Sequence, residues 1–184
     1  MKTLSKIVGG LVAGLALLLV VVRFTGFSPT GDIPGPANYP GLWLSGEVVT
    51  APVTDWSFTK QYKTDKVETH PWYGIPHSVT TSHIVYNGQL YLTSLFRANV
   101  PFPEGKAWVN NITRDPHVRV RFGDKLYELV LSHVTDEQER AAVLAARGDV
   151  AAGPPPNGAV LHLFRAQPEG SLSAGVGGKS AGSN

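Results

Sequence analysis

Residues 78–94 read SVTTSHIVYNGQLYLTS, and they carry the clearest folding signal in the chain. Two runs rich in Val, Ile, Thr, Tyr and Leu flank Asn87-Gly88, a dipeptide that tolerates positive φ at both central positions of a type I′ turn. The pattern predicts two antiparallel strands joined by a tight hairpin. One face of the first strand carries small hydroxyls and neither face is purely apolar, as in strands that border a ligand.

The composition indicates one globular domain of ordinary size with appendages. Of the 184 residues, 42% are hydrophobic, which is enough for a buried core. The formal net charge is +2 and no run of Lys or Arg could neutralise several phosphates, so we expect no nucleic-acid partner. The chain contains no cysteine, which excludes disulfides, thiolate zinc sites and cysteine nucleophiles.

Residues 7–22 form an uncharged, apolar run between Lys6 and Arg23. At about 1.5 Å per residue, a helix of this length spans most of the hydrocarbon core of a bilayer, and the flanking basic side chains can reach the headgroups. We therefore expect residues 1–27 to be a membrane anchor with one transmembrane helix. The alternative is a cleaved signal peptide, but residues 23–27, RFTGF, offer no small-x-small cleavage site.

The charges around this run predict its orientation. Lys2, Lys6 and the terminal amine precede it, whereas only Arg23 follows it closely. Positive charge is preferentially retained on the cytoplasmic side of a membrane. We therefore expect a cytoplasmic N-terminus and a C-terminal domain outside the cytoplasm, in the periplasm if the source is bacterial.

Composition divides the rest of the chain into three parts. Residues 28–40, SPTGDIPGPANYP, are dense in Pro and Gly and predict a linker that spaces the folded domain from the bilayer. The folded domain is expected over residues 41–166. Residues 167–184 are rich in Gly, Ser and Ala and predict a disordered tail.

The folded domain has a mainly β pattern with short helical segments. Its order fits a small antiparallel barrel with helices at its edge. The predicted elements are a strand at 66–69, the hairpin at 78–94, a loop at 95–105, a helical turn at 106–112, a second hairpin at 117–134, a helix at 135–146 and a last strand at 159–164.

Residues 106–120, KAWVNNITRDPHVRV, are the most specific motif of the domain. They follow a hairpin that ends in YLTS, at 91–94, and precede a glycine turn, a strand and the acidic helix start VTDEQER, at 134–140. In this order the motifs resemble the FMN-binding split-barrel superfamily, which includes pyridoxamine 5'-phosphate oxidase-like (PNPOx-like) proteins and a deazaflavin-dependent nitroreductase-like branch. The resemblance covers residues 68–164 and implies a split β-barrel with flanking helices, here preceded by one N-terminal transmembrane helix.

The resemblance also implies a cofactor site. In such barrels the strand that corresponds to residues 78–83 runs beside the flavin ring, and the end of the next strand, here Thr93 and Ser94, meets the cofactor phosphate together with a basic residue. Hydroxyl and cationic donors that converge on one point suit a phosphate. The cofactor-binding residues implied in this way are Ser78, Val79, Thr80, Thr81, Thr93, Ser94, Arg97, Lys106 and Trp108.

Each of these residues also fits an ordinary structural role. The insertion at residues 95–105 separates the two hydroxyls from Lys106 by more than in compact members of the superfamily. The hydroxyls fit strand residues without a ligand, and Lys106 and Arg97 fit solvated surface charges. Trp108 fits a core position as well as a stacking partner of the flavin.

Other catalytic classes lack their signatures. The six histidines show no HxxxH or HxH spacing, so no metal site is predicted, and GxSxG, P-loop and Rossmann glycine motifs are absent. Three functions remain. The first is a membrane-anchored oxidoreductase that uses FMN or a deazaflavin on a small-molecule substrate, with catalytic residues that the sequence does not identify. The second is a cofactor-free barrel that serves as a binding or assembly module, and the third is a haem-binding relative with one histidine as axial ligand.

We also expect a homodimer. The resemblance places cofactor sites at a subunit interface, and Arg119 and Arg121 make one face of their strand too polar for a simple core-facing position. In a two-fold pair, each site would draw residues from both chains.

Overall fold

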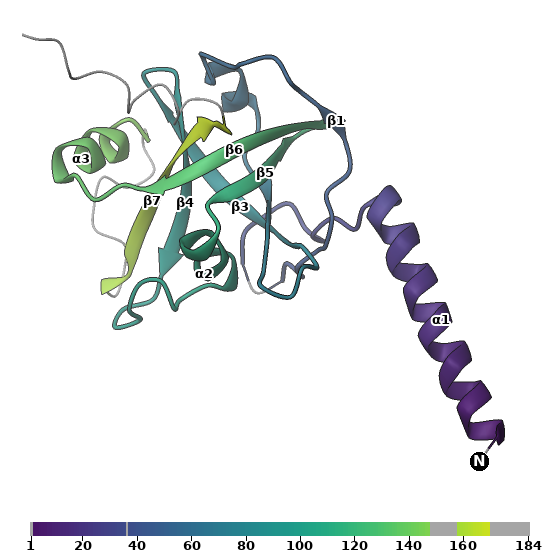
Figure 1. The fold of residues 1–184 in the computed structure, drawn as a ribbon. Coiled ribbons are helices and arrows are strands. Elements are labelled where there is room, and N and C mark those ends of the chain that lie inside the picture. The colour runs from purple at the N-terminus through teal and green to yellow at the C-terminus, as the bar shows by residue number, and fades with distance from the viewer. Residues whose placement is uncertain (1, 36, 148–157, 170–184) are drawn as a thin grey trace, which may run out of the picture.

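The computed structural model of the chain describes residues 2–35, 37–147 and 158–169, and Figure 1 shows its fold. An N-terminal helix is followed by a β-rich domain that carries two further α-helices. In chain order the elements are α1 (Lys2–Thr25), β1 (Glu47–Val48), the 3₁₀-helix η1 (Ser57–Gln61), β2 (Asp65–Thr69), β3 (His77–Tyr86), β4 (Gln89–Phe96), α2 (Ala107–Arg114), β5 (His117–Phe122), β6 (Lys125–His133), α3 (Glu137–Ala145) and β7 (Val160–Pro168).

Six strands close into an antiparallel barrel. The order of neighbours is β6-β5-β2-β3-β4-β7, and the pairing of β7 back onto β6 completes the ring. The start of β6 pairs in parallel with β1, with Glu47 opposite Lys125, whereas residues 129–133 of β6 pair with β7. One edge of β6 is therefore shared between two strands, and the barrel is split at this point. The predicted fold, an antiparallel split barrel with helices at its edge, is confirmed.

The hairpin predicted at residues 78–94 forms with the expected turn. β3 and β4 pair antiparallel, with Ser82 opposite Thr93. Asn87 and Gly88 have φ angles of 51° and 76°, the positive values that a type I′ turn requires. The sequence therefore predicted the position of this turn correctly.

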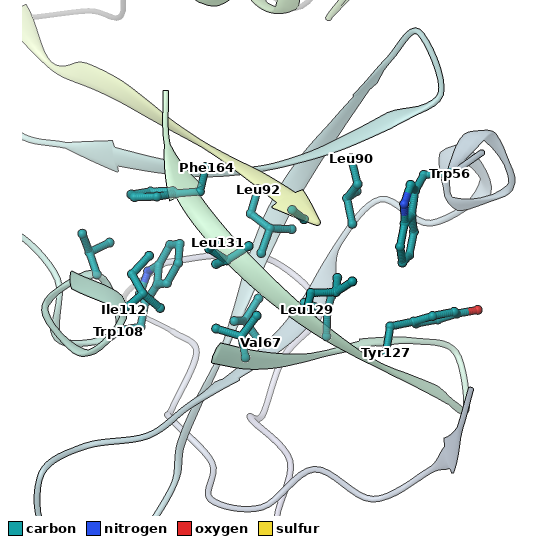
Figure 2. Packing of buried hydrophobic residues seen from close by; sticks show 14 of the residues in the cluster. Trp56, Val67, Leu90, Leu92, Trp108, Ile112, Tyr127, Leu129, Leu131 and Phe164 are labelled. Carbon is teal, nitrogen blue, oxygen red and sulfur yellow. The ribbon is translucent and has the colours of Figure 1, made fainter. Parts of the chain in front are cut away.

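Apolar side chains fill the barrel (Figure 2). At one end of the cluster Trp56, which precedes η1, packs edge-on against Tyr127 with ring centroids 5.0 Å apart. At the other end Trp108 of α2 packs edge-on against Phe164, with centroids 5.3 Å apart. Burial of such large rings is a main source of stability in a domain of this size. The residues labelled in Figure 2 are Trp56, Val67, Leu90, Leu92, Trp108, Ile112, Tyr127, Leu129, Leu131 and Phe164.

α3 covers the outside of the barrel with a second, smaller apolar cluster. Its Val143 is fully buried among residues of β3, β4 and β7. The helix begins where the acidic segment predicts, because Asp136 Oδ1 accepts a hydrogen bond from Glu139 N at 2.7 Å and caps the first turn.

The last strand is longer than the sequence pattern indicates. Gln167 and Pro168 still pair with β6, opposite Val130 and Leu129. The folded domain therefore extends two residues beyond its expected end at residue 166. The tail expected after it lies, from residue 170 onward, outside the described residues.

The expected linker does not stand away from the domain. Residues 27–31 and 39–45, which we call the strap, lie against the outer face of the barrel. Gly41 and Ser78 of β3 exchange two backbone hydrogen bonds, of 2.8 and 3.0 Å, and Thr80 donates to a strap carbonyl at 3.2 Å. Pro and Gly suit this irregular path, and its free carbonyls accept hydrogen bonds from the strands.

α1 leaves the barrel as a separate helix (Figure 1). Its segment Thr3–Thr25 is long and apolar enough to cross a membrane, and none of its most apolar window is buried in the protein. A membrane anchor and a signal sequence both contain an apolar helix of this kind, so the helix fits both expectations for the N-terminus. Beyond the helix, Phe27 N donates to Trp43 O at 2.8 Å, which joins the end of α1 to the strap.

A buried ion pair holds the strap to the barrel. Glu68 of β2 is 1% exposed, and its two carboxylate oxygens accept hydrogen bonds from Arg119 Nη2 of β5 at 2.8 and 2.7 Å. The carboxylate also accepts from Leu44 N at 2.5 Å, and Arg119 Nη2 donates to Leu44 O at 3.3 Å. A charge removed from water must be paired and hydrogen-bonded. The ion pair and the strap therefore stabilise each other.

We predict that Arg119→Ala strongly destabilises the domain, because it leaves Glu68 buried without its cation. Removal of one member of a buried pair costs about 3 to 5 kcal/mol. Arg121→Ala is the matched control on the same strand face. It removes one hydrogen bond, from Arg121 Nη1 to Ser45 O at 3.1 Å, and should cost about 1 kcal/mol. Urea unfolding of the full chain in detergent, followed by tryptophan emission, measures both, and equal losses would contradict the assignment.

Candidate functional site

The start of β3, the end of β4 and the start of α2 lie at the end of the barrel opposite the Asn87-Gly88 turn, which we call the α2 end. β3 and β4 pair antiparallel as far as Ser82 and Thr93, and beyond that point the start of β3 pairs with β2 and the end of β4 pairs with β7. The loop between β4 and α2 returns to its starting point, since a Cβ atom on Gly105 would lie 2.5 Å from the ring of Phe96. Lys106 therefore lies next to the end of β4, although nine residues of sequence, 97–105, come between them.

Strand alternation divides the hydroxyl residues named from the sequence between two faces. Val79 packs against the core inside the barrel, so Thr81, two residues on, faces inward too. On β4, Leu92 and Phe96 belong to the core, which places Ser94 on the inner face as well. The outer face carries Ser78, Thr80 and Thr93.

The three threonines are hydrogen-bonded within the protein. Thr81 Oγ1 donates to Thr93 O at 2.6 Å, and Thr93 Oγ1 donates to Ser82 O at 2.9 Å. Thr80 Oγ1 donates to the strap carbonyl of Gly31 at 3.2 Å. These hydroxyls join the strands to each other and to the strap, so a structural role accounts for their contacts.

The two serines differ from the threonines. Ser78 and Ser94 are only 0% and 4% exposed, and within the described residues neither side-chain oxygen has a hydrogen-bond partner. A buried polar group without a partner costs about 1 to 3 kcal/mol. Such a group in a folded protein therefore indicates a place for a further donor or acceptor. Ser94 meets this description at the α2 end, on the inner face of the barrel wall.

Two cations and a helix start lie at the same end. Arg97 and Lys106 are exposed, and among the described residues no hydrogen bond or ion pair engages either side chain. Lys106 is the N-cap of α2, and no side chain caps the first N–H groups of this helix. Free N–H groups at a helix start attract anions. With Ser94, the α2 end thus has the donors that a phosphate requires.

Trp108 occupies a core position. It is 4% exposed and belongs to the cluster that fills the barrel. Its role in this structure is to pack α2 onto the barrel. This packing positions the start of the helix, where Lys106 is the N-cap.

The two arginines that suggested a subunit interface have partners within the chain. Arg119 binds Glu68 and Leu44, and Arg121 binds Ser45. The strap thus explains the polar face of β5 without a second subunit. The homodimer stays a prediction that depends on the family resemblance alone.

A polar cavity of about 410 Å³ was not indicated by the sequence. It lies between the end of α1, the strap and the strands β2, β5 and β6. At its edge His117 donates to Asp115 at 2.8 Å. Partial burial raises the pKa of Asp115, but the hydrogen bonds from His117 outweigh it, and this pKa lies below its ordinary value. The charged or imidazole side chains of the lining include Arg23, Glu68, His70, His117, Arg119 and Glu128.

A pair of histidines was also missed. His133 Nε2 of β6 and His162 Nδ1 of β7 lie 3.1 Å apart, and the ring of Phe102 stacks on His133 with centroids 4.3 Å apart and planes 8° apart. Burial lowers the pKa of both imidazoles, so at neutral pH both are uncharged and one donates to the other. The spacing of the two histidines in the sequence does not indicate this pair, because the contact joins two different strands. Within the described ranges no group of three or more His, Asp or Glu residues is placed to hold a metal ion.

No family model matches this sequence. A search of curated proteins likewise found no match.

Solved structures with a similar fold exist at low sequence identity. One is a NimC/NimA family protein from Clostridium acetobutylicum, with 13% identity, coverage of 58% of this chain and 75% of that chain, and a TM-score of 0.44. Another is HutZ, a haem storage protein from Vibrio cholerae, with 17% identity, coverage of 61% and 85%, and a TM-score of 0.44. A third is a pyridoxamine 5'-phosphate oxidase-related, FMN-binding protein from Nostoc punctiforme, with 15% identity, coverage of 61% and 72%, and a TM-score of 0.36.

At the level of the fold, the resemblance to split barrels expected from the sequence is confirmed. It says nothing by itself about ligands, because proteins with one fold bind different groups.

We predict that Ser94→Ala leaves the free protein as stable as before or slightly more stable, because it removes a buried hydroxyl that has no partner. Thr81→Val is the matched control on the same face of the neighbouring strand. It removes the 2.6 Å hydrogen bond to Thr93 O and should cost about 1 kcal/mol. Denaturation of both full-length variants without added cofactor gives the comparison. A loss for Ser94→Ala as large as that for Thr81→Val would show that Ser94 has a structural role instead.

Proposed function

We propose that the chain binds a phosphorylated flavin, FMN or a deazaflavin, at the α2 end of the barrel and acts as an oxidoreductase on a small molecule. The observation that carries the proposal is the buried, unpartnered hydroxyl of Ser94 at the same end as Lys106 and the uncapped start of α2. Hydroxyl, ammonium and N–H donors at one end of a barrel suit a phosphate dianion. The resemblance of residues 68–164 to FMN-binding barrels supports a flavin as the carrier of that phosphate.

Each group has a defined task in this proposal. Lys106 and Arg97 neutralise the phosphate charge, and Ser94 donates a hydrogen bond from the barrel wall. The first N–H groups of α2 complete the anion site. When bound, the cofactor supplies hydride transfer, and the chain binds it, orients it and limits the access of water.

A cofactor-free binding module is the second candidate, and one observation favours it. The strap lies over Ser78 and Thr80 on the outer face, and both belong to the residues that the resemblance places beside the flavin ring. A ring on that face would have to displace the strap. In the module proposal the strap is permanent, and the barrel serves as a scaffold for a partner.

A haem-binding role remains the third candidate. It requires an imidazole that can ligate iron. The partly buried pair His133 and His162 supplies two imidazoles that are uncharged at neutral pH. The visible absorbance of the purified full chain separates the three candidates, because flavins, deazaflavins and haem absorb differently and the module does not absorb.

We predict that Lys106→Ala weakens FMN or deazaflavin binding by about ten-fold to a hundred-fold, the loss expected for one charge-assisted phosphate contact. Folding should persist, because Lys106 is exposed. Lys125→Ala, at the start of β6, is the matched control and should bind the cofactor as the unchanged chain does. Titration of each variant with the cofactor, followed by flavin fluorescence, gives the two affinities. If they are equal, the phosphate is held elsewhere and the module becomes the better proposal.

We also propose that α1 is an uncleaved anchor and that the barrel lies outside the cytoplasm, in the periplasm if the source is bacterial. Arg23, in the last turn of α1, lies over the ring of Trp43 at 6.0 Å and lines the polar cavity. The end of the helix is thus part of the folded domain, which supports its retention in the mature protein.

For the topology we predict that a C-terminal alkaline phosphatase fusion is active and that a C-terminal fluorescent-protein fusion, which needs the cytoplasm to mature, stays dark. The charge asymmetry around residues 7–22 is the physical reason. The opposite pair of results would reverse the topology. A mature N-terminus after Gly26, found by mass spectrometry, would replace the anchor with a signal peptide.

A further inference from the structure

Two aromatic side chains stand exposed in the connection between β2 and β3. Trp72 is 83% exposed, more than any other large hydrophobic side chain of the described residues, and Tyr73 is 54% exposed. Their rings pack edge to face with centroids 5.6 Å apart. A tryptophan ring stabilises a protein mainly when it is removed from water. Its exposure here indicates a surface that contacts something else.

Hydrogen bonds and a buried proline tie this connection to the folded domain. Gly74 N donates to Pro71 O at 3.1 Å and closes a turn around the aromatic pair. Before the turn, the carbonyl of His70 accepts a hydrogen bond from Arg114 of α2. After it, Pro76 is buried immediately before β3. The two rings therefore lose little backbone freedom when they bind.

The pair lies on the side of the barrel where α1 leaves it. Arg23, in the last turn of α1, lines the same cavity as Gly74 and Pro76. Figure 1 shows β3 beginning on the side of the barrel that faces α1. At the end of the helix, Phe24 and Phe27 are 81% and 51% exposed. Exposed aromatic rings from two distant segments thus gather where an apolar helix meets the domain.

We propose that Trp72 and Tyr73 dock the barrel on the surface of the bilayer, with their rings in the interfacial region beside α1. This inference depends on the proposed anchor. Trp and Tyr favour the interface between water and hydrocarbon, because each combines an apolar ring with a polar N–H or O–H group. Arg23 places a cation at the level of the headgroups. The barrel would then keep one orientation relative to the membrane instead of moving freely on a tether.

A bilayer fits this surface better than a second protein does. The aromatic pair projects from a turn, and neither ring lines the polar cavity. Arg23 and Gly74 line one cavity, so a bilayer that α1 crosses lies within reach of the turn. Because the turn and α1 belong to the same chain, insertion of the helix places the aromatic pair near the lipid, and no separate binding step is needed.

The absence of cysteine allows a specific test. Tyr73→Cys places a single thiol in the aromatic turn and keeps Trp72. Gln138→Cys is the matched control, because Gln138 is exposed and lies in the first turn of α3, which is on the side of the barrel away from α1 in Figure 1. Both full-length variants are labelled with the fluorophore NBD and reconstituted into phosphatidylcholine vesicles, with or without bromine on the upper acyl chains.

We expect bromine to lower the emission of the label at position 73 by about twofold and to leave the label at position 138 unchanged, since interfacial groups lie within reach of the upper acyl chains. Trp72→Ala in the Tyr73→Cys background should reduce this quenching, because Tyr73 is already replaced and the remaining ring of the docking pair is then lost. Flotation of the same samples on a density gradient reports whether α1 is inserted.

The outcomes separate this inference from the proposed anchor. A protein that floats with the vesicles but shows no bromine quenching at position 73 would overturn the docking and leave the anchor intact. A protein that does not float would overturn the anchor and the docking together. Emission at position 73 that follows the protein-to-lipid ratio, and not bromination, would assign the turn to a second copy of the chain and overturn the bilayer contact.

Discussion

The pairing of Glu68 with Arg119 is the constraint on which the polar architecture of this domain depends. A carboxylate that is 1% exposed stays charged only if a cation and further donors replace its water. The backbone of Leu44 provides one donor and one acceptor to the pair. The strap is thereby fixed over the outer faces of β2, β3 and β5. Trp43 of the strap lines the polar cavity, and the strap joins the end of α1 to the barrel.

Closure of the barrel decides which polar groups remain available for function. Thr93 and Ser94 are neighbours in the sequence, but the strand alternation turns them to opposite faces. The outward Thr93 hydroxyl is bonded to β3, whereas the inward Ser94 hydroxyl finds no partner among the described residues. Of these two neighbouring residues, Thr93 therefore joins two strands, whereas the hydroxyl of Ser94 is available to a ligand.

Short-range physics explains what could be predicted from the sequence. The turn at Asn87 and Gly88 follows from the positive φ angles that these two residues tolerate. The cap at Asp136 follows from a carboxylate placed before free N–H groups. Of the candidate site, the family resemblance named residues that the structure brings to one end of the barrel, among them Ser94 and Lys106. It did not separate the buried, bonded threonines from the unpartnered serines, because that distinction depends on partners in other strands.

By itself, the sequence determined the apolar helix, the hairpin turn and the helix cap, since each depends on patterns within about ten neighbouring residues. The order of the predicted elements along the chain indicated the antiparallel barrel. Only the tertiary structure decided that the Pro- and Gly-rich segment is a strap and not a free linker, and that His133 meets His162 across two strands. It also decided that the exposed Trp72 turn lies beside the end of α1. These contacts join residues far apart in the chain, and their geometry exists only once the strands have closed into a ring.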